Sequence, residues 1–354
     1  MAIDLSSVRS LALRVDSGSA YEALLGLGMA RSGWAELRHT EGARIVARLK
    51  ALPAPLRRAI RSVDSGVGFN WFDLIGLVSR AEPPRGIPEL TRLLEAMDPL
   101  DLKLAMLGFH KLEYRRSVGE ALFRAAAAGR KDSMDGFREA AAKSEGGGGG
   151  PLLALPPDVV RERTVAILSE LPEDFYLADR SSAGLFAESA EEASALTATL
   201  KPSQVLERMT KGIVYTGEPG VEGVLLVPTL IFRPWTMIID HERVKIFCYP
   251  IPLARISGEL PDAEMVALFR ALGDETRLRL LKRIARGKAS FGQLARELGL
   301  AKSTVFHHAL QLRTAGLLRL DLESSGLELA PDLPGMDRLL RGYLADPAND
   351  QGLR

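Results

Sequence analysis

The sequence predicts a mainly α-helical protein with small antiparallel β elements, and three observations support this fold class. Apolar residues recur at helical spacing in most of the chain, for example in residues 21–29 and 42–52. Prolines such as Pro83 and Pro84 separate these helical segments. Residues 223–249 are instead rich in Val, Ile and Phe, and the polar break at 240–243 predicts a β-hairpin there.

Composition limits the classes to which the protein can belong. The chain has 354 residues, a formal net charge of +1, 26% charged residues and 46% hydrophobic residues. This balance excludes a wholly disordered chain and allows two or three domains. The single cysteine, Cys248, excludes an internal disulfide framework and a multi-cysteine metal cluster. The sequence shows no signal peptide and no apolar run of membrane-spanning length, so we expect a cytoplasmic protein without a membrane partner.

A run of five glycines, Gly146 to Gly150, is the strongest break in the chain and predicts a flexible linker. Helices are expected before it, including one over 100–112, and after it over 157–171, where Asp158 is a candidate N-cap. The predicted domains are a helical N-terminal region (1–145), a Gly/Pro-rich linker (146–157), an α+β middle region with the hairpin (158–257), a further domain (262–331) and a C-terminal helix or tail (332–354).

The domain over 262–331 carries the clearest pattern. Helical periodicity predicts four helices, over 262–271, 275–285, 291–298 and 304–315. Asp274, Ser290 and Ser303 are the expected N-caps of the last three. Gly299 ends the third helix only a few residues before the fourth, which is the layout of a helix-turn-helix. Alternating residues over 317–322 and 327–330 predict a two-stranded hairpin, so the domain is expected to be a winged helix.

Several separated motifs in this domain resemble one family. Residues 271–281 (ALGDETRLRLL) and 298–305 (LGLAKSTV), then His307-His308, Leu312-Arg313 and 315–317, occur in the order and spacing of ArsR-type winged-helix repressors. The resemblance covers about 262–330, and the upstream region is similar, more loosely, to the long N-terminal extension of some members. It implies a DNA-binding transcription regulator and a structural role for His308.

The charge of this domain differs from that of the whole chain. Residues 274–313 contain nine basic and three acidic residues, an excess of six. Neutralisation of phosphates by Lys and Arg supplies most non-specific DNA affinity. The near-zero total charge is therefore an average over a basic winged helix and a slightly acidic remainder.

Side chains near the start of the helix over 303–315 are the expected base contacts. Lys302 can donate to guanine O6 and N7, and Ser303 can bind a base or a phosphate. Thr304, in the first turn, suits a phosphate held with backbone amides. Phe306 can contact a thymine methyl group, and His307 can donate to a base or a phosphate.

Two further cations, Arg277 and Arg313, complete the predicted DNA-contacting set. The wing differs from the family pattern, because Asp321 and Glu323 stand where members often place Arg or Lys. We therefore expect the wing to contribute less to DNA binding, or to lie off the backbone.

No catalytic, metal or cofactor site is predicted. The third helix, 291–298, has no cysteine pair, which a soft-metal sensor of this family needs. His110 with Glu113 is expected to be a helix-surface or core pair, and His241 to lie in a solvated turn. Trp71 is expected in the core, although an aromatic effector pocket stays open.

The sequence thus favours a sequence-specific DNA-binding transcriptional regulator, a repressor rather than an enzyme, that binds a double-stranded operator as a homodimer. The N-terminal region would provide dimerisation and effector sensing, with the small-molecule effector unidentified. The alternative is an enzyme or small-molecule-binding protein in residues 1–250, with an appended winged helix used for protein interaction.

Overall fold

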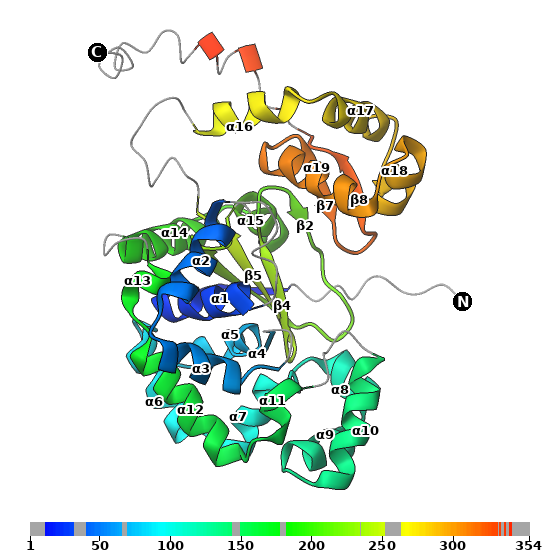
Figure 1. The fold of residues 1–354 in the computed structure, drawn as a ribbon. Helices are drawn as coiled ribbons and strands as arrows, with labels where there is room; N and C mark the ends of the chain where they lie inside the picture. The colour runs from blue at the N-terminus through cyan, green and yellow to red at the C-terminus, as the bar shows by residue number, and fades with distance from the viewer. Residues whose placement is uncertain are drawn as a thin grey trace. The chain divides into compact units, whose positions relative to one another are not determined.

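The structure, a computed structural model, describes residues 11–31, 40–65, 69–143, 149–177, 182–233, 235–251 and 263–331, with 333, 336–337 and 340–341. The chain forms two compact units (Figure 1). The helical unit comprises residues 13–191 and 221–249, and the winged-helix unit comprises 192–220 and 250–354 together with 1–12.

Most elements of the helical unit are short helices that follow one another closely along the chain. They are α1 (Ser19–Arg31), α2 (Thr40–Ala51), α3 (Ala54–Ser62), α4 (Phe69–Phe72), α5 (Ile75–Val78), α6 (Ile87–Ala96), α7 (Pro99–Met106), α8 (Leu112–Val118), α9 (Glu120–Ala127), α10 (Lys131–Ala142), α11 (Gly150–Ala154), α12 (Pro157–Glu170), α13 (Glu173–Tyr176) and α14 (Ser182–Leu196), whose last residues fall in the second unit.

The helix α1 is buried on all sides from Ala20 to Met29, and apart from Glu22 these residues are apolar, aromatic or glycine, as is typical of an interior helix. A sheet in the order β1-β3-β5-β4 completes the unit, with β1 (Ala12–Val15), β3 (Gly223–Thr229), β4 (Met237–His241) and β5 (Val244–Pro250). The predicted hairpin is confirmed, because β4 pairs antiparallel with β5. Glu22 of α1 braces the end of β3, since its carboxylate accepts hydrogen bonds from the Thr229 hydroxyl (2.7 Å) and the Leu230 amide (3.0 Å).

Two local predictions in this unit are wrong. The expected helix over 100–112 is interrupted, because Gly108 adopts φ +86°, a left-handed conformation that ends α7 and is open to glycine. Asp158 does not cap α12, whose N-cap position is Pro156.

The structure also corrects the predicted linker. Residues 144–148 lie outside the described chain, but 149–157 are folded into the helical unit. Leu152 and Leu153 of α11 are fully buried. The buried Lys103 donates hydrogen bonds to the carbonyls of Leu153 (2.9 Å) and Leu155 (2.6 Å), so α7 holds this segment in place. The glycine-rich composition predicted a flexible linker between domains. Long-range packing instead makes residues 149–157 part of the helical unit.

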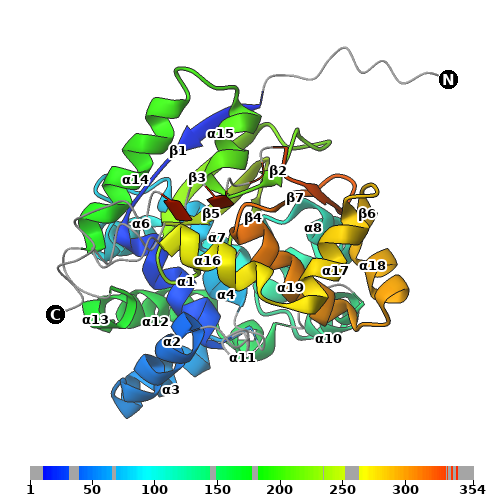
Figure 2. The same cartoon turned by 90° about the horizontal axis from the view of Figure 1, so that it is seen from above.

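The winged-helix unit contains the four predicted helices and an upstream helix–strand pair. Its elements are α15 (Pro202–Met209), β2 (Ile213–Val214), α16 (Ala263–Leu272), α17 (Glu275–Ile284), β6 (Ala289–Ser290), α18 (Phe291–Leu298), α19 (Lys302–Thr314), β7 (Leu318–Asp321) and β8 (Gly326–Leu329). Figures 1 and 2 show α17, α18 and α19 side by side. Leu280, Leu294, Val305 and Leu312 lie in one hydrophobic core with the wing residues Leu318 and Leu327.

The sheet of this unit departs from a purely antiparallel arrangement. Its order is β2-β7-β8-β6, and the wing strands β7 and β8 pair antiparallel as expected. The strand β2, however, pairs parallel with β7, with Ile213 opposite Leu320 and Val214 opposite Asp321. The predicted middle region 158–257 is therefore divided between the two units, and its residues 202–214 extend the winged helix.

None of the described helices is long and apolar enough to cross a membrane. In the predicted C-terminal segment, 336–337 and 340–341 are helical, and the rest of 332–354, apart from residue 333, lies outside the described residues.

Candidate nucleic-acid interface

Side-chain caps and a glycine shape the helix-turn-helix. The Asp274 carboxylate accepts a hydrogen bond from the Arg277 amide (2.9 Å) at the start of α17. Ser290 and Gln293 form a reciprocal capping box at the start of α18, and Gly299 ends that helix at φ +67°. The helix α19 then begins at Lys302 with Ala301 as N-cap, so Ser303 lies in the first turn and is not the predicted cap.

The recognition helix α19 is divided by burial. Lys302, Ser303, Phe306 and His307 are exposed, and Thr304 is half-buried. The opposite face is buried and includes Val305, Ala309, Leu310 and Leu312. The five predicted contacts between 302 and 307 thus lie on the free end of one helix whose back is fixed by packing.

A hydrogen-bond chain positions His307. The Arg277 guanidinium donates to the Gln311 side-chain oxygen, so the Gln311 amide nitrogen is left to donate to His307 Nε2, 3.2 Å away. In neutral His307, Nε2 is then the acceptor and Nδ1 carries the proton. The arrangement leaves an exposed N–H donor suited to a guanine or phosphate oxygen.

Arg277 takes part in this hydrogen-bond chain and also links α17 to the end of α16. Its other donors bind the carbonyls of Ala271 (2.6 Å) and Arg270 (2.7 Å) at the end of α16, and its side chain is 11% exposed. Because these partners occupy the guanidinium, the structure supports a positioning role for Arg277 in place of the predicted direct contact with DNA.

The first turn of α18 lies against the first turns of α19. The rings of Phe291 and Phe306 are 5.6 Å apart, and Phe306 is still 43% exposed. At Gly292, an added Cβ would lie 3.6 Å from Lys302 Cε and 3.9 Å from Arg296 Nη1, so these two cations occupy one surface. Helical periodicity within α19 could not place Arg296 there, because the contact depends on how two helices cross.

Arg313 is the clearest departure from the predicted set. Its side chain is buried, and the guanidinium donates hydrogen bonds to the carbonyls of Thr210 and Lys211, the latter at 2.9 Å. Burial lowers the pKa of Arg313 to about 10. A cation enclosed by carbonyls cannot reach a phosphate, so Arg313 joins α19 to the upstream segment instead of binding DNA.

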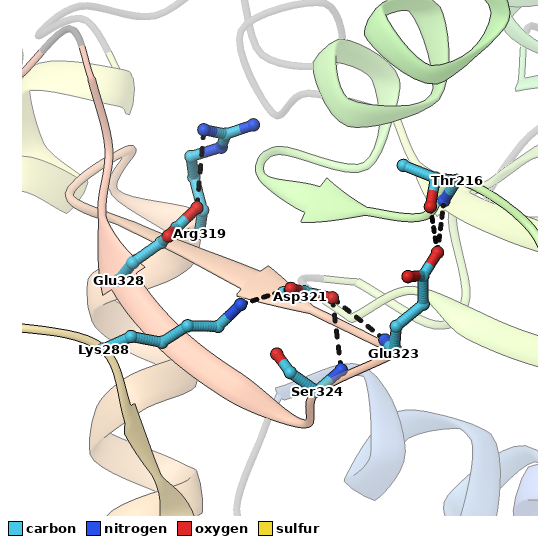
Figure 3. Close-up of polar contacts among 7 residues, drawn as sticks. All are labelled: Thr216, Lys288, Arg319, Asp321, Glu323, Ser324 and Glu328. Carbon is cyan, nitrogen blue, oxygen red and sulfur yellow. Dashed lines mark hydrogen bonds and ion pairs between the residues drawn. The ribbon is translucent and has the colours of Figure 1, made fainter. Parts of the chain in front are cut away.

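The wing is occupied by contacts within the protein (Figure 3). The Asp321 carboxylate accepts hydrogen bonds from the amides of Glu323 (3.0 Å) and Ser324 (3.3 Å) and pairs with Lys288. The Lys288 ammonium lowers the pKa of Asp321 to about 2. The Glu323 carboxylate accepts hydrogen bonds from the Thr216 amide and hydroxyl, just beyond β2.

The base of the wing is joined to the same upstream segment. Arg319 of β7 pairs with Glu207 of α15 (2.5 Å) and with Glu328 of β8 (3.5 Å). Gly212 has φ +94°, and a Cβ there would lie 2.8 Å from the Leu318 carbonyl, so a glycine lets β2 approach β7. We call residues 202–216 the wing brace, because they hold the outer edge of the wing.

Within the described chain, no group of three or more His, Cys, Asp or Glu residues could hold a metal ion. In the helical unit, His110 and His241 lie in ring contact at 4.7 Å, and His110 Nε2 is 3.5 Å from the Asp73 carboxylate. Partial burial lowers the pKa of His241 to about 3, and this half-buried last residue of β4 contacts His110 instead of lying in the predicted solvated turn.

Comparison with known proteins bears on the C-terminal part alone. No curated protein and no solved structure matches the chain. Residues 274–319 match the family model described as bacterial regulatory protein, arsR family. That interval runs from the Asp274 cap through both helices of the helix-turn-helix to Arg319 of the wing, which is the part whose geometry fits DNA. The chain therefore carries an ArsR-family regulatory domain of the DNA-binding transcription regulators.

Proposed function

We propose that this protein is a sequence-specific transcriptional repressor and not an enzyme, with the first two turns of α19 as its base-contacting element. One observation carries this proposal: Lys302, Ser303, Phe306 and His307 project from a helix end whose opposite face is buried in the domain core. Recognition helices of helix-turn-helix proteins contact base edges with residues near this end.

The chemistry of each side chain suggests its partner. Lys302 donates to guanine O6 and N7, and the Nδ1–H of His307 donates to an acceptor in the same groove. Phe306, braced by Phe291, presents an aromatic edge to a thymine methyl group. Ser303 and Thr304 at the helix start suit a phosphate bound together with backbone amides.

A homodimer is the expected form on DNA. Phe269 of α16 is 40% exposed, and Met336 and Leu340 are 45% and 41% exposed. Burial of these apolar side chains against a second copy would remove them from water. A two-fold dimer would bind half-sites about one helical turn, ~34 Å, apart.

Effector control would pass through the wing brace. Residues 202–216 form part of the winged-helix unit, while the chain on either side continues into the helical unit. A ligand that favours one conformation of the helical unit could bias DNA binding through this segment, with a coupling free energy set by its differential affinity. We also propose that the protein acts in the cytoplasm, because its DNA operator lies there.

Fluorescence anisotropy tests the proposal directly. The full chain is titrated with labelled duplex DNA from upstream of its own gene and with a scrambled duplex of equal length, with sedimentation confirming the oligomer. We expect selective binding to the upstream duplex as a dimer, with affinity falling as salt rises. A folded protein with no preference between the two duplexes would refute the repressor and support the alternative of an enzyme or binding protein in residues 1–250.

A further inference from the structure

A row of cations lies on α17 and on the turn that follows it, outside the recognition helix. Arg279 and Lys282 lie three residues apart on α17, Arg286 follows in the turn directly after the helix, and all three side chains are exposed. With Arg283 they line an open hollow that Glu297 and Leu298 of α18 close on the other side. We call Arg279, Lys282 and Arg286 the α17 cation row.

The row differs from two neighbouring cations, which are paired with carboxylates inside the domain. Arg283 is paired with Glu297, its Nη2 lying 3.1 Å from the carboxylate, and Lys288 is paired with Asp321. The first pair joins α17 to α18, and the second joins the segment just before β6 to the wing. Like charges that lie close together on one surface repel one another, so the cation row favours an anionic partner.

The chain path connects one end of this row to the proposed DNA-contacting end of α19 through β6 and the start of α18. After Arg286 the chain enters β6, where Ser290 pairs with Gly326 at the tip of the wing. It then enters α18, whose Phe291 meets Phe306 and whose Gly292 lies against Lys302. Arg296 and Lys302 continue the cationic surface between α18 and α19.

We propose that the α17 cation row is a second phosphate-binding surface, which contacts the backbone of duplex DNA flanking the base pairs bound by α19. The proposal rests on the proposed function and deepens it by naming where the domain obtains its sequence-independent affinity. It also gives a physical consequence of the braced wing: the cations of α17 supply phosphate contacts that the acidic wing does not.

The salt dependence of DNA affinity measures the contribution of the α17 cation row. The triple variant Arg279→Gln, Lys282→Gln and Arg286→Gln is compared with the parent chain on a duplex that extends about one helical turn, ~10 base pairs, beyond the operator on each side. Loss of three phosphate contacts lowers the slope of log affinity against log salt by about 3. The affinity advantage of the parent over the variant should therefore grow about 40-fold as salt falls from about 200 to about 50 mM, and the operator-to-scrambled affinity ratio should stay unchanged.

A matched control removes the same charge elsewhere. Arg124, Arg138 and Lys143 in the helical unit are 48%, 47% and 73% exposed, and each is paired with an acidic residue one turn away. Their triple Gln variant should keep the parent slope. Circular dichroism melting confirms that both variants are folded, since exposed side chains are replaced in each.

The outcomes separate this inference from the proposed function. If the parent chain prefers its operator and the α17 variant keeps the parent's salt slope and DNA affinity, only the phosphate-binding surface is overturned. If the parent chain binds DNA without sequence preference and the variant shows a reduced salt slope, the proposed operator recognition is refuted and the phosphate-binding surface is supported. A parent chain that binds no duplex overturns both. On a duplex shortened to the base pairs bound by α19, the difference in affinity between the parent and the variant should be smaller.

Discussion

The two projecting parts of the winged helix use their charged side chains in opposite ways. The start of α19 leaves Lys302 and His307 exposed, and the packing behind them fixes the helix. The wing instead binds its own chain, with Asp321 held by Lys288 and Glu323 held by Thr216. The difference shows that membership of a basic domain does not make a residue available to DNA, because availability depends on which partners the rest of the chain supplies.

The largest effect is expected at the free end of α19. Lys302→Ala combined with His307→Ala removes two base contacts worth about 1–3 kcal/mol each, so the preference for operator over scrambled DNA should fall about 30-fold or more. Competition anisotropy measures the preference. Glu323→Ala, on the wing, is the matched control and should leave it unchanged. An operator preference retained by the double variant would show that another element contacts the bases.

Arg313→Ala should produce the next largest effect, on stability rather than on DNA contact. It leaves the carbonyls of Thr210 and Lys211 without their charged donor, at a cost of about 2–4 kcal/mol. Urea unfolding followed by circular dichroism measures it. The exposed Arg296→Ala should change stability by less than about 0.5 kcal/mol. Equal stability of the two variants would contradict the buried role of Arg313.

Gln311→Ala tests how His307 is positioned. Without the Gln311 amide, His307 loses the donor to Nε2 and the preference for one tautomer, at a cost of about 1 kcal/mol. Operator affinity should fall about fivefold while scrambled-duplex affinity stays the same. The loss should disappear in a His307→Ala background if the two residues act through one contact. If Gln311→Ala lowered operator affinity equally in the His307→Ala background, Gln311 would not act through His307.

The smallest effect concerns the ion pair at the wing. The pKa of Asp321 is lowered from 3.8 to about 2, so its contribution to stability is present above the ordinary pKa and is lost as the pH falls through about 2. Because both side chains are partly exposed, the contribution is below about 1 kcal/mol. Urea midpoints of the parent and Asp321→Asn should differ at pH 5 and converge near pH 2. A difference that grows as the pH falls would contradict this sign.

Local signals predicted the helix-turn-helix well. Asp274, Ser290 and Gly299 act through backbone groups within a few residues, so their positions in the sequence were enough to place α17 and α18. The same reasoning misplaced the start of α19 at Ser303, because Ala301 serves as N-cap without a side-chain bond. It also missed β6, which is too short to carry an alternating pattern.

The sequence by itself determined the four helices, the turn, the wing hairpin and the exposed face of α19, since each follows from the periodicity or capping of neighbouring residues. Only the tertiary structure decided which cations are available. Arg313 meets Thr210 across 103 positions of the chain, and β2 meets β7 across a similar separation. Such contacts depend on how distant segments pack, and no local pattern records them. Burial and pairing therefore removed Arg277 and Arg313 from the DNA-contacting set and left the row on α17 exposed.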